Sequence, residues 1–297
     1  MRKTSLFILF MVLLIIPSAH TLRRMDYREG MLKNVCKELK GDVLLYFVFV
    51  DNKETSPWTE FDIQSTIDSI SLAAQWIQQQ AAARNIQLKI RTDYYIGNDF
   101  ATIPKNLSHG TIQKTITELG LRDGLEDLNL WSDGIAKKAG MSYTPPAKDG
   151  IPDVKNPRNK ERLIAYLRDS YGVESVAFIL LLNNYFRTDI SIPVNTYETR
   201  DVEFAVVSYK YPSEIAHNFL HLFGAADLYG TPFRRNEKKI NEALQAFPRD
   251  IMTDPYGRDL RTLEIGPFTR YLIGWDKDLA PRYQELLTDK PISYKLP

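Results

Sequence analysis

Apolar residues follow two different periods in the first third of the chain, and each period predicts a different element. Residues 41–50 (GDVLLYFVFV) form a nearly unbroken apolar run, which is typical of a strand buried on both faces. Over residues 58–84 the apolar positions recur at helical spacing and predict a long amphipathic helix. Residues 87–95 alternate polar and apolar side chains and predict a second strand. A strand, a helix and a strand in this order favour a parallel pair.

Similar patterns continue through the rest of the chain. Residues 160–171 have helical spacing, and the apolar runs at 173–182 and 202–209 predict two more buried strands. Between these groups, residues 97–157 are rich in Gly, Pro, Asn and Asp, with short helical patterns around 111–119. This composition predicts a loop-rich insertion rather than a separate domain. The expected core is therefore a sheet with helices.

Composition changes this picture mainly by exclusion. The 297 residues are 44% hydrophobic and 25% charged, which is an ordinary globular balance. Lys and Arg (38) nearly cancel Asp and Glu (37), so no overall field favours nucleic acid or an anionic membrane surface. The one cysteine, Cys36, excludes an intrachain disulfide and any site built from several cysteines. A metal would have to be held by His, Asp or Glu.

The beginning of the chain differs from the rest. Two basic residues precede an apolar run at 6–16, and small residues follow it, which predicts a signal peptide over residues 1–20. The apolar run is shorter than the roughly 20 residues that a bilayer span needs. An uncleaved N-terminal anchor is the alternative. We expect residues 21–297 to form a single domain that is secreted or periplasmic, with no stable membrane span after cleavage.

Candidate metal ligands follow the last predicted strand, in the segment EIAHNFLHLFGAADLY that begins at Glu214. His217 and His221 are four residues apart, so on a helix both imidazoles lie on one face and can reach one ion. Gly224 comes where a glycine can end a helix with positive φ, and that turn can bring Asp227 to the same ion. Two imidazoles and a carboxylate leave a fourth position for water, as in catalytic zinc sites. The alternative is that both histidines are packed side chains without a metal.

The segment HNFLHLFGAAD resembles the metzincin motif HExxHxxGxxH/D, in the variant whose third ligand is an aspartate. The tripeptide DIM that ends at Met252 resembles the methionine turn beneath the metal of metzincins. The resemblance covers about residues 200–275. It implies a zincin-like α+β domain with a mixed twisted sheet, and one Zn²⁺ held by His217, His221 and Asp227. It also implies hydrolysis of a peptide or protein substrate by metal-activated water.

Asn218 departs from this motif, because metzincins have a glutamate at that position. The glutamate takes a proton from the water and later passes it to the leaving amine. An amide has no group that titrates near neutrality, and loss of a general base costs about 10²–10⁴ in rate. The sequence therefore predicts a retained metal site with weak or lost hydrolysis. An inactive pseudopeptidase that binds a peptide or protein is the alternative.

Another carboxylate, Glu214, lies one helical turn before Asn218 on nearly the same face. The sequence favours a surface or supporting role for it over that of a replacement base. A motif register shifted by four residues would keep Glu214 as the base and place Ser213 where the first histidine should be. That register leaves His221 and Gly224 unexplained, so the first register is preferred.

Other candidates depend on sequence proximity alone. Tyr229 and Tyr256 are close enough to the motif to supply an oxyanion donor, although ordinary packing is the favoured interpretation. Tyr185 and Arg187 follow a predicted strand and would border a groove if an extended peptide added to the sheet edge. Residues 265–275 predict a helix after the methionine turn, with its aromatic side chains packed under the site.

Overall fold

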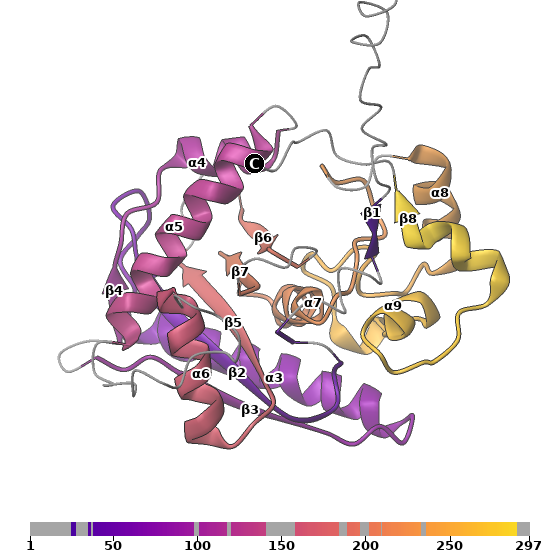
Figure 1. Cartoon of the computed structure of the whole chain (residues 1–297), viewed down its shortest axis with the longest axis horizontal. Coiled ribbons are helices and arrows are strands. Elements are labelled where there is room, and N and C mark those ends of the chain that lie inside the picture. The colour runs from indigo at the N-terminus through magenta and orange to yellow at the C-terminus, as the bar shows by residue number, and fades with distance from the viewer. Residues whose placement is uncertain are drawn as a thin grey trace, which may run out of the picture.

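A single six-stranded mixed sheet with helices on both of its faces organises the computed structural model (Figure 1). The structure describes residues 25–27, 35–36, 38–97, 101–117, 120–140, 158–183, 189–196, 202–208, 210–232 and 236–289. The signal-peptide prediction for residues 1–20 lies outside this part of the chain, as do Tyr185 and Arg187. The observed architecture is α+β.

The sheet is built around its longest strand, β2 (Gly41–Asp51). The other strands are β3 (Leu88–Tyr94), β4 (Thr102–Pro104), β5 (Ser175–Leu182), β6 (Ser191–Val194) and β7 (Phe204–Val207). They lie in the order β3-β2-β5-β7-β6, and β4 pairs with the end of β2. The predicted parallel pairing of β2 and β3 is confirmed. β6 is antiparallel to β7, which makes the sheet mixed.

Two hydrophobic cores explain why β2 is apolar along nearly its whole length. Its odd-numbered side chains from Val43 to Phe49 pack with α3 and α7, whereas its even-numbered side chains from Leu44 to Val50 pack with α4, α5 and α6. These helices are α3 (Glu60–Ala82), α4 (His109–Thr115), α5 (Leu121–Gly140), α6 (Asn159–Tyr171) and α7 (Pro212–Leu222). Strand side chains alternate between faces, so a strand covered on both sides needs apolar residues throughout.

The region predicted to be loop-rich contains a 20-residue helix, α5, that the sequence analysis missed. Its glycines made the segment look like a loop in the sequence, because glycine is a poor helix former. Gly124 is nevertheless required by packing: a Cβ atom there would lie 2.8 Å from the side chain of Thr115 on α4. The apolar spacing of Leu121, Leu128 and Ile135, all buried, was the available evidence for this helix.

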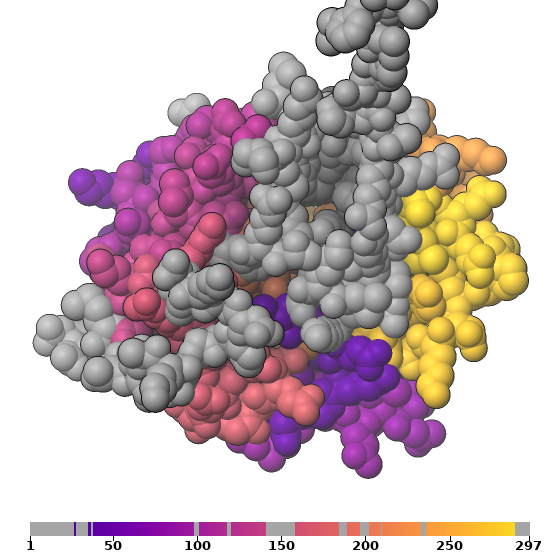
Figure 2. Space-filling model, in the orientation of Figure 1, coloured from indigo at the N-terminus to yellow at the C-terminus, as the bar shows by residue number. Residues whose placement is uncertain are grey.

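The C-terminal part of the described chain lies on one side of the molecule. Figure 2 shows these residues in orange and yellow on the right, opposite the magenta and pink surface on the left. The elements are α8 (Glu237–Ala246), α9 (Pro267–Leu272) and β8 (Thr288–Asp289), which pairs antiparallel with the N-terminal strand β1 (Met25–Asp26). α9 confirms the helix expected over 265–275 but is shorter. None of the helices in the described residues combines the length and apolar character that a bilayer span requires.

Candidate metal centre

The helix α7 lies at the centre of the molecule and carries most of the candidate site (Figure 1). It packs against α3, β5, β6 and β7, and residues 213–222 are all buried. Polar side chains on such a helix need partners inside the protein, because burial without hydrogen bonds is costly. The chain turns after α7 at Gly224, whose φ is +90°, so the predicted glycine turn is confirmed.

The structure brings His217, His221 and Asp227 together, as the spacing predicts. The Nε2 atom of His221 lies 3.0 Å from Nε2 of His217 and 3.1 Å from Oδ1 of Asp227. The Nε2 atom of His217 lies 3.3 Å from the same carboxylate oxygen. Both imidazoles are buried, with 1% exposure. Three potential ligand atoms therefore form a compact triangle inside the protein.

Backbone carbonyls determine which nitrogen of each imidazole faces this triangle. Nδ1 of His217 lies 3.3 Å from the carbonyl oxygen of Ile251, and Nδ1 of His221 lies 2.8 Å from that of Ala225. A carbonyl only accepts hydrogen bonds, so each Nδ1 carries the proton and each Nε2 presents a lone pair. The carboxylate of Asp227 is also an acceptor. Three acceptors this close repel one another unless a cation or a proton lies among them.

The size of the triangle fits a small divalent ion. Ligand bonds of about 2.0–2.1 Å in a tetrahedral zinc site place ligand atoms roughly 3.3–3.4 Å apart. The observed separations of 3.0 to 3.3 Å are close to that value. Within the described residues, this is the group of three His, Cys, Asp or Glu side chains whose ligand atoms all lie within 4.8 Å of one another. These residues could hold one zinc ion.

A proton is the competing occupant of the triangle. Burial opposes the charged form of His221, but the carboxylate of Asp227 outweighs burial and raises the pKa of this imidazole. Burial lowers the pKa of His217, and the neighbouring His221 lowers it further. Burial alone would raise the pKa of Asp227, but the two imidazoles hold it well below its usual range. One proton, on His221, is therefore the cation that the chain can supply by itself.

A tight turn that ends with Met252 lies against the triangle, where the sequence predicts the methionine turn. The carboxylate of Asp250 holds this turn by accepting hydrogen bonds from the backbone of Met252 (3.0 Å) and Gly266 (3.0 Å) and from Thr269 Oγ1 (2.7 Å). Burial raises the pKa of Asp250 to about 6. Asp250 and Met252 are both buried, so the turn is an internal support.

The same turn is hydrogen-bonded to one candidate ligand, His217, and to the residue that follows another, Asp227. The carbonyl of Ile251 is the partner of His217 Nδ1. The carbonyl of Met252 accepts a hydrogen bond of 2.8 Å from the backbone of Leu228, directly after Asp227. The turn therefore orients one imidazole and fixes the backbone that carries the carboxylate.

Asn218 is fully buried and does not point a titratable group at the triangle. Its amide nitrogen donates to Ser191 Oγ (2.8 Å) and to the backbone carbonyl of Glu214 (2.9 Å). Its Oδ1 atom is buried without a hydrogen-bond partner among the described residues. Ser191 could not be predicted from the sequence, because nothing in the local pattern of β6 shows that this strand lies beside α7.

The surface role considered for Glu214 is wrong, because its side chain is only 3% exposed. Burial, and then the negative charge of Asp227, raise the pKa of Glu214 to about 7. The interaction of its carboxyl group with the Ser191 hydroxyl opposes the rise of its pKa. The residue is therefore a buried carboxyl group in the electrostatic surroundings of the candidate ligands.

The two tyrosine candidates lie in different surroundings. The ring of Tyr229 is nearly parallel to that of His217, at 6.3 Å between ring centres. Tyr256 is 53% exposed and makes an edge-to-face pair with Tyr211, at 5.6 Å. Packing explains the position of Tyr229, whereas Tyr256 lies at the surface near the start of α7. An oxyanion role for either tyrosine stays a prediction.

Comparisons with known proteins add no family to this description. No protein-family model, curated protein or solved structure matches the chain. Only the chemistry of the site and the motif residues therefore indicate a function. The metzincin assignment stays a prediction from those residues.

Proposed function

We propose that this chain is an exported protein of the zinc metallopeptidase class, of the metzincin type, with weak or lost hydrolysis. His217, His221 and Asp227 hold one Zn²⁺ in this proposal. The observation that carries it is the set of three buried acceptors, 3.0 to 3.3 Å apart, with both Nδ1 atoms committed to backbone carbonyls. The strand, helix and strand before α7, and the turn at Met252, agree with the zincin-like domain that the motif implies.

Zinc held by His217, His221 and Asp227 would act as a Lewis acid, which would polarise a substrate carbonyl and make water more acidic. The chain itself provides orientation. The carbonyls of Ile251 and Ala225 fix the imidazole tautomers, and Asp250 fixes the turn beneath them. β6 is the last strand of the sheet path and packs against α7. An extended peptide or protein segment that pairs with this strand would pass next to the site.

Asn218 accounts for the expected weakness of hydrolysis. Its nitrogen is occupied by Ser191 and by the carbonyl of Glu214, and an amide cannot hold the proton of the attacking water. The metal ligands do not include position 218, so zinc binding is independent of this change. A pseudopeptidase that binds a peptide is the second candidate function. The full burial of Asn218 within a hydrogen-bond network favours it, because the asparagine is an integrated part of the site.

The test compares zinc-loaded residues 21–297 with the variant Asn218→Glu on a mixed fluorogenic peptide library. We expect about one zinc per chain in both proteins, and measurable hydrolysis by the parent that is about 10²–10⁴ slower than that by the variant. Metal content is measured by elemental analysis after gentle purification, with His217→Ala as the control that loses zinc. A parent chain that retains less than about 0.1 equivalents of zinc would contradict the metal site. Full zinc without hydrolysis in either protein would leave the binding function.

A further inference from the structure

Glu214 shares one face of α7 with both candidate histidine ligands. It lies three residues before His217 and seven before His221, so the three side chains follow a single stripe along the helix. The largest charge acting on Glu214 is that of Asp227. Glu214 is outside the group of ligand atoms that lie within 4.8 Å of one another. The carboxylate therefore lies on the helix face that carries both imidazoles without being one of the corners of the triangle.

A short hydrogen-bond network lies beside this residue. Asn218 Nδ2 donates to Ser191 Oγ (2.8 Å), and the same nitrogen donates to the backbone carbonyl of Glu214 (2.9 Å). The serine oxygen accepts from Asn218, so its own proton points elsewhere, and the interaction of this hydroxyl with the carboxyl group of Glu214 favours the charged form of that group. Asn218 thus orients Ser191, and Ser191 orients Glu214. All three side chains come from α7 and the adjacent strand β6.

A neutral asparagine at position 218 is compatible with a buried carboxylate at position 214, whereas a glutamate there is not. A glutamate at 218 would bring a second buried negative charge one helical turn from Glu214, where like charges destabilise each other. It would also lose the nitrogen that donates to both Ser191 and the Glu214 carbonyl. The donor at 218 and the carboxylate at 214 therefore belong to one arrangement.

We propose that Glu214 is the proton acceptor of this site, positioned by Ser191 and Asn218, and that it carries the hydrolysis of which the chain is capable. The inference rests on the proposed zinc peptidase function. A proton acceptor must lie one hydrogen bond, or one water, outside the ligands. Glu214 is a candidate for this role because it is buried, shares the helix face of both imidazoles and is not one of the three ligand residues.

The proton moves in a closed cycle. The oxygen of a water molecule bonds to the carbonyl carbon of the peptide, and the carboxylate of Glu214 takes the proton that this water loses. The C–N bond then breaks, with its electron pair left on nitrogen. Glu214 returns the proton to that nitrogen, which leaves as the amine. The carboxylate is regenerated, and the net reaction consumes one water per peptide bond.

The first experiment measures zinc content and peptide hydrolysis for the parent, Glu214→Gln, and the double variant Glu214→Gln with Asn218→Glu. Glu126→Gln, which changes an exposed glutamate on α5, is the matched control. We expect every protein to bind about one zinc, and Glu214→Gln to lose at least about 100-fold in rate. The double variant should regain hydrolysis, because it has one carboxylate at the usual position. Glu126→Gln should cleave as the parent does.

A binding measurement gives a readout that needs no turnover. A peptide hydroxamic acid loses its proton when it binds zinc, and isothermal titration calorimetry in buffers of different ionisation enthalpy counts the protons released. If Glu214 takes that proton, the parent releases about zero protons to buffer and Glu214→Gln releases about one. Zinc content is measured on the same samples.

The outcomes separate the two proposals. Equal hydrolysis by the parent and Glu214→Gln, or equal proton release on hydroxamate binding, would overturn the role of Glu214 while leaving the zinc site intact. Hydrolysis by Asn218→Glu but not by the zinc-loaded parent would also overturn it, because Glu214 would then be unable to act. A chain that binds no zinc would refute the proposed function itself and this inference with it.

Discussion

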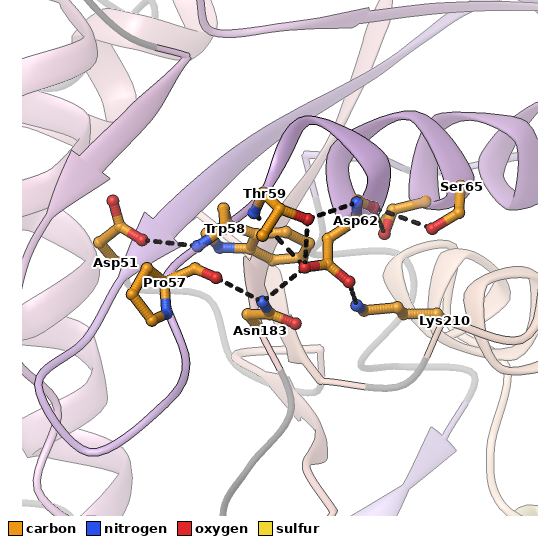
Figure 3. Close-up of polar contacts among 9 residues, drawn as sticks. Asp51, Pro57, Trp58, Thr59, Asp62, Ser65, Asn183 and Lys210 are labelled. Atoms are coloured by element: carbon orange, nitrogen blue, oxygen red, sulfur yellow. Dashed lines mark hydrogen bonds and ion pairs between the residues drawn. The ribbon is translucent and has the colours of Figure 1, made fainter.

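Two polar clusters lie near α7, and they differ in how their charges are balanced. In the first, which we call the Asp62 cluster, the carboxylate of Asp62 accepts from Thr59 Oγ1 (2.7 Å), Asn183 Nδ2 (3.2 Å) and Lys210 Nζ (2.6 Å) (Figure 3). In the second, the carboxylate of Asp227 faces imidazole nitrogens whose protons point elsewhere. The Asp62 cluster supplies its own donors, whereas the metal centre consists of acceptors. The difference is that the Asp62 carboxylate is neutralised by a lysine of the chain, whereas the candidate metal centre requires a bound proton or a metal ion among its acceptors.

The Asp62 cluster also has a clear structural task. Thr59 and Asp62 form the capping box of α3, Asn183 follows β5, and Lys210 comes two residues before α7. The ammonium group of Lys210 lies 5.3 Å from the ring centre of Trp58. The cluster therefore joins the start of α3 to the segment that enters the helix of the metal centre. One acceptor of the cluster has no donor: Asn183 Oδ1 is buried without a hydrogen-bond partner among the described residues.

Removal of zinc should have the largest effect, and only on the second cluster. A ligand that binds the folded state at 1,000 times its Kd adds about 4 kcal/mol to the free energy of unfolding. We expect a chelator to lower the unfolding free energy of the zinc-loaded parent by about that amount, measured by urea denaturation at pH 8. Asp62→Asn should keep the response to chelator, whereas His221→Ala should lose it. An unchanged denaturation curve for the parent would contradict the difference between the clusters.

Loss of the Asp62 carboxylate should have the next largest effect. Asp62→Ala removes the partners of Thr59, Asn183 and Lys210, and we expect it to cost about 2–3 kcal/mol of unfolding free energy without changing zinc content. The exposed Asp68→Ala on the same helix is the control, within about 0.5 kcal/mol of the parent. Equal effects of the two substitutions in urea denaturation would show that the cluster is not a structural tie.

The pH dependence of this stabilisation follows from the pKa of Asp62. Its hydrogen bond with Lys210 lowers that pKa to about 2, against an unfolded value of about 3.9. A lowered pKa means that the stabilisation is fully present above the unfolded value and is lost as the pH falls through the folded one. The difference between the parent and Asp62→Ala should therefore shrink between about pH 4 and pH 2.

The sequence predicted those parts of the fold that depend on local pattern. The apolar run of β2, the helical spacing of α3 and the glycine after α7 each encode their element within a few residues. The triangle of His217, His221 and Asp227 was predictable for the same reason, because one helix and one turn bring all three together. Spacing alone was sufficient there.

The features that could not be predicted depend on contacts between distant segments. Ser191 lies on β6, and only the pairing of β6 with β7 places it beside Asn218 and Glu214. The burial of Glu214 follows from the same packing, so a helical pattern alone could not distinguish it from a surface residue. Helix α5 was missed because the close contact that requires Gly124 involves α4, whereas its glycine content suggested loops.

The ionisation of Glu214 should have a smaller effect on the free energy of unfolding. It should lower this free energy, whereas the ionisation of Asp62 raises it. Burial raises its pKa to about 7, above an unfolded value of about 4.3. Ionised Glu214 therefore costs stability, increasingly so as the pH rises from about 4.3 to 7. In the presence of chelator, Glu214→Gln should gain roughly 1–2 kcal/mol over the parent at pH 8 and nothing at pH 4, by urea denaturation. A gain of equal size at both pH values would show that ionisation is not its cause.

The smallest effect should come from Lys210→Met, which removes the cation of the Asp62 cluster but keeps an apolar chain against Trp58. The ion pair is partly exposed, with side-chain exposures of 30% for Lys210 and 24% for Asp62. Such pairs contribute at most about 1 kcal/mol, and Thr59 and Asn183 still donate to the carboxylate. We expect a loss of about 0.5–1 kcal/mol, smaller in 1 M salt, because salt screens exposed charges.

A double-mutant cycle then tests whether the two clusters are independent. Lys210→Met and His221→Ala should be additive within about 0.5 kcal/mol in zinc-free protein, because they share no hydrogen-bond partner. Zinc content should be unchanged by Lys210→Met. A larger coupling, or a loss of zinc, would mean that the ion pair before α7 helps to hold the histidines in place. The Asp62 cluster would then contribute to the metal site through Lys210, and the two clusters would not be independent.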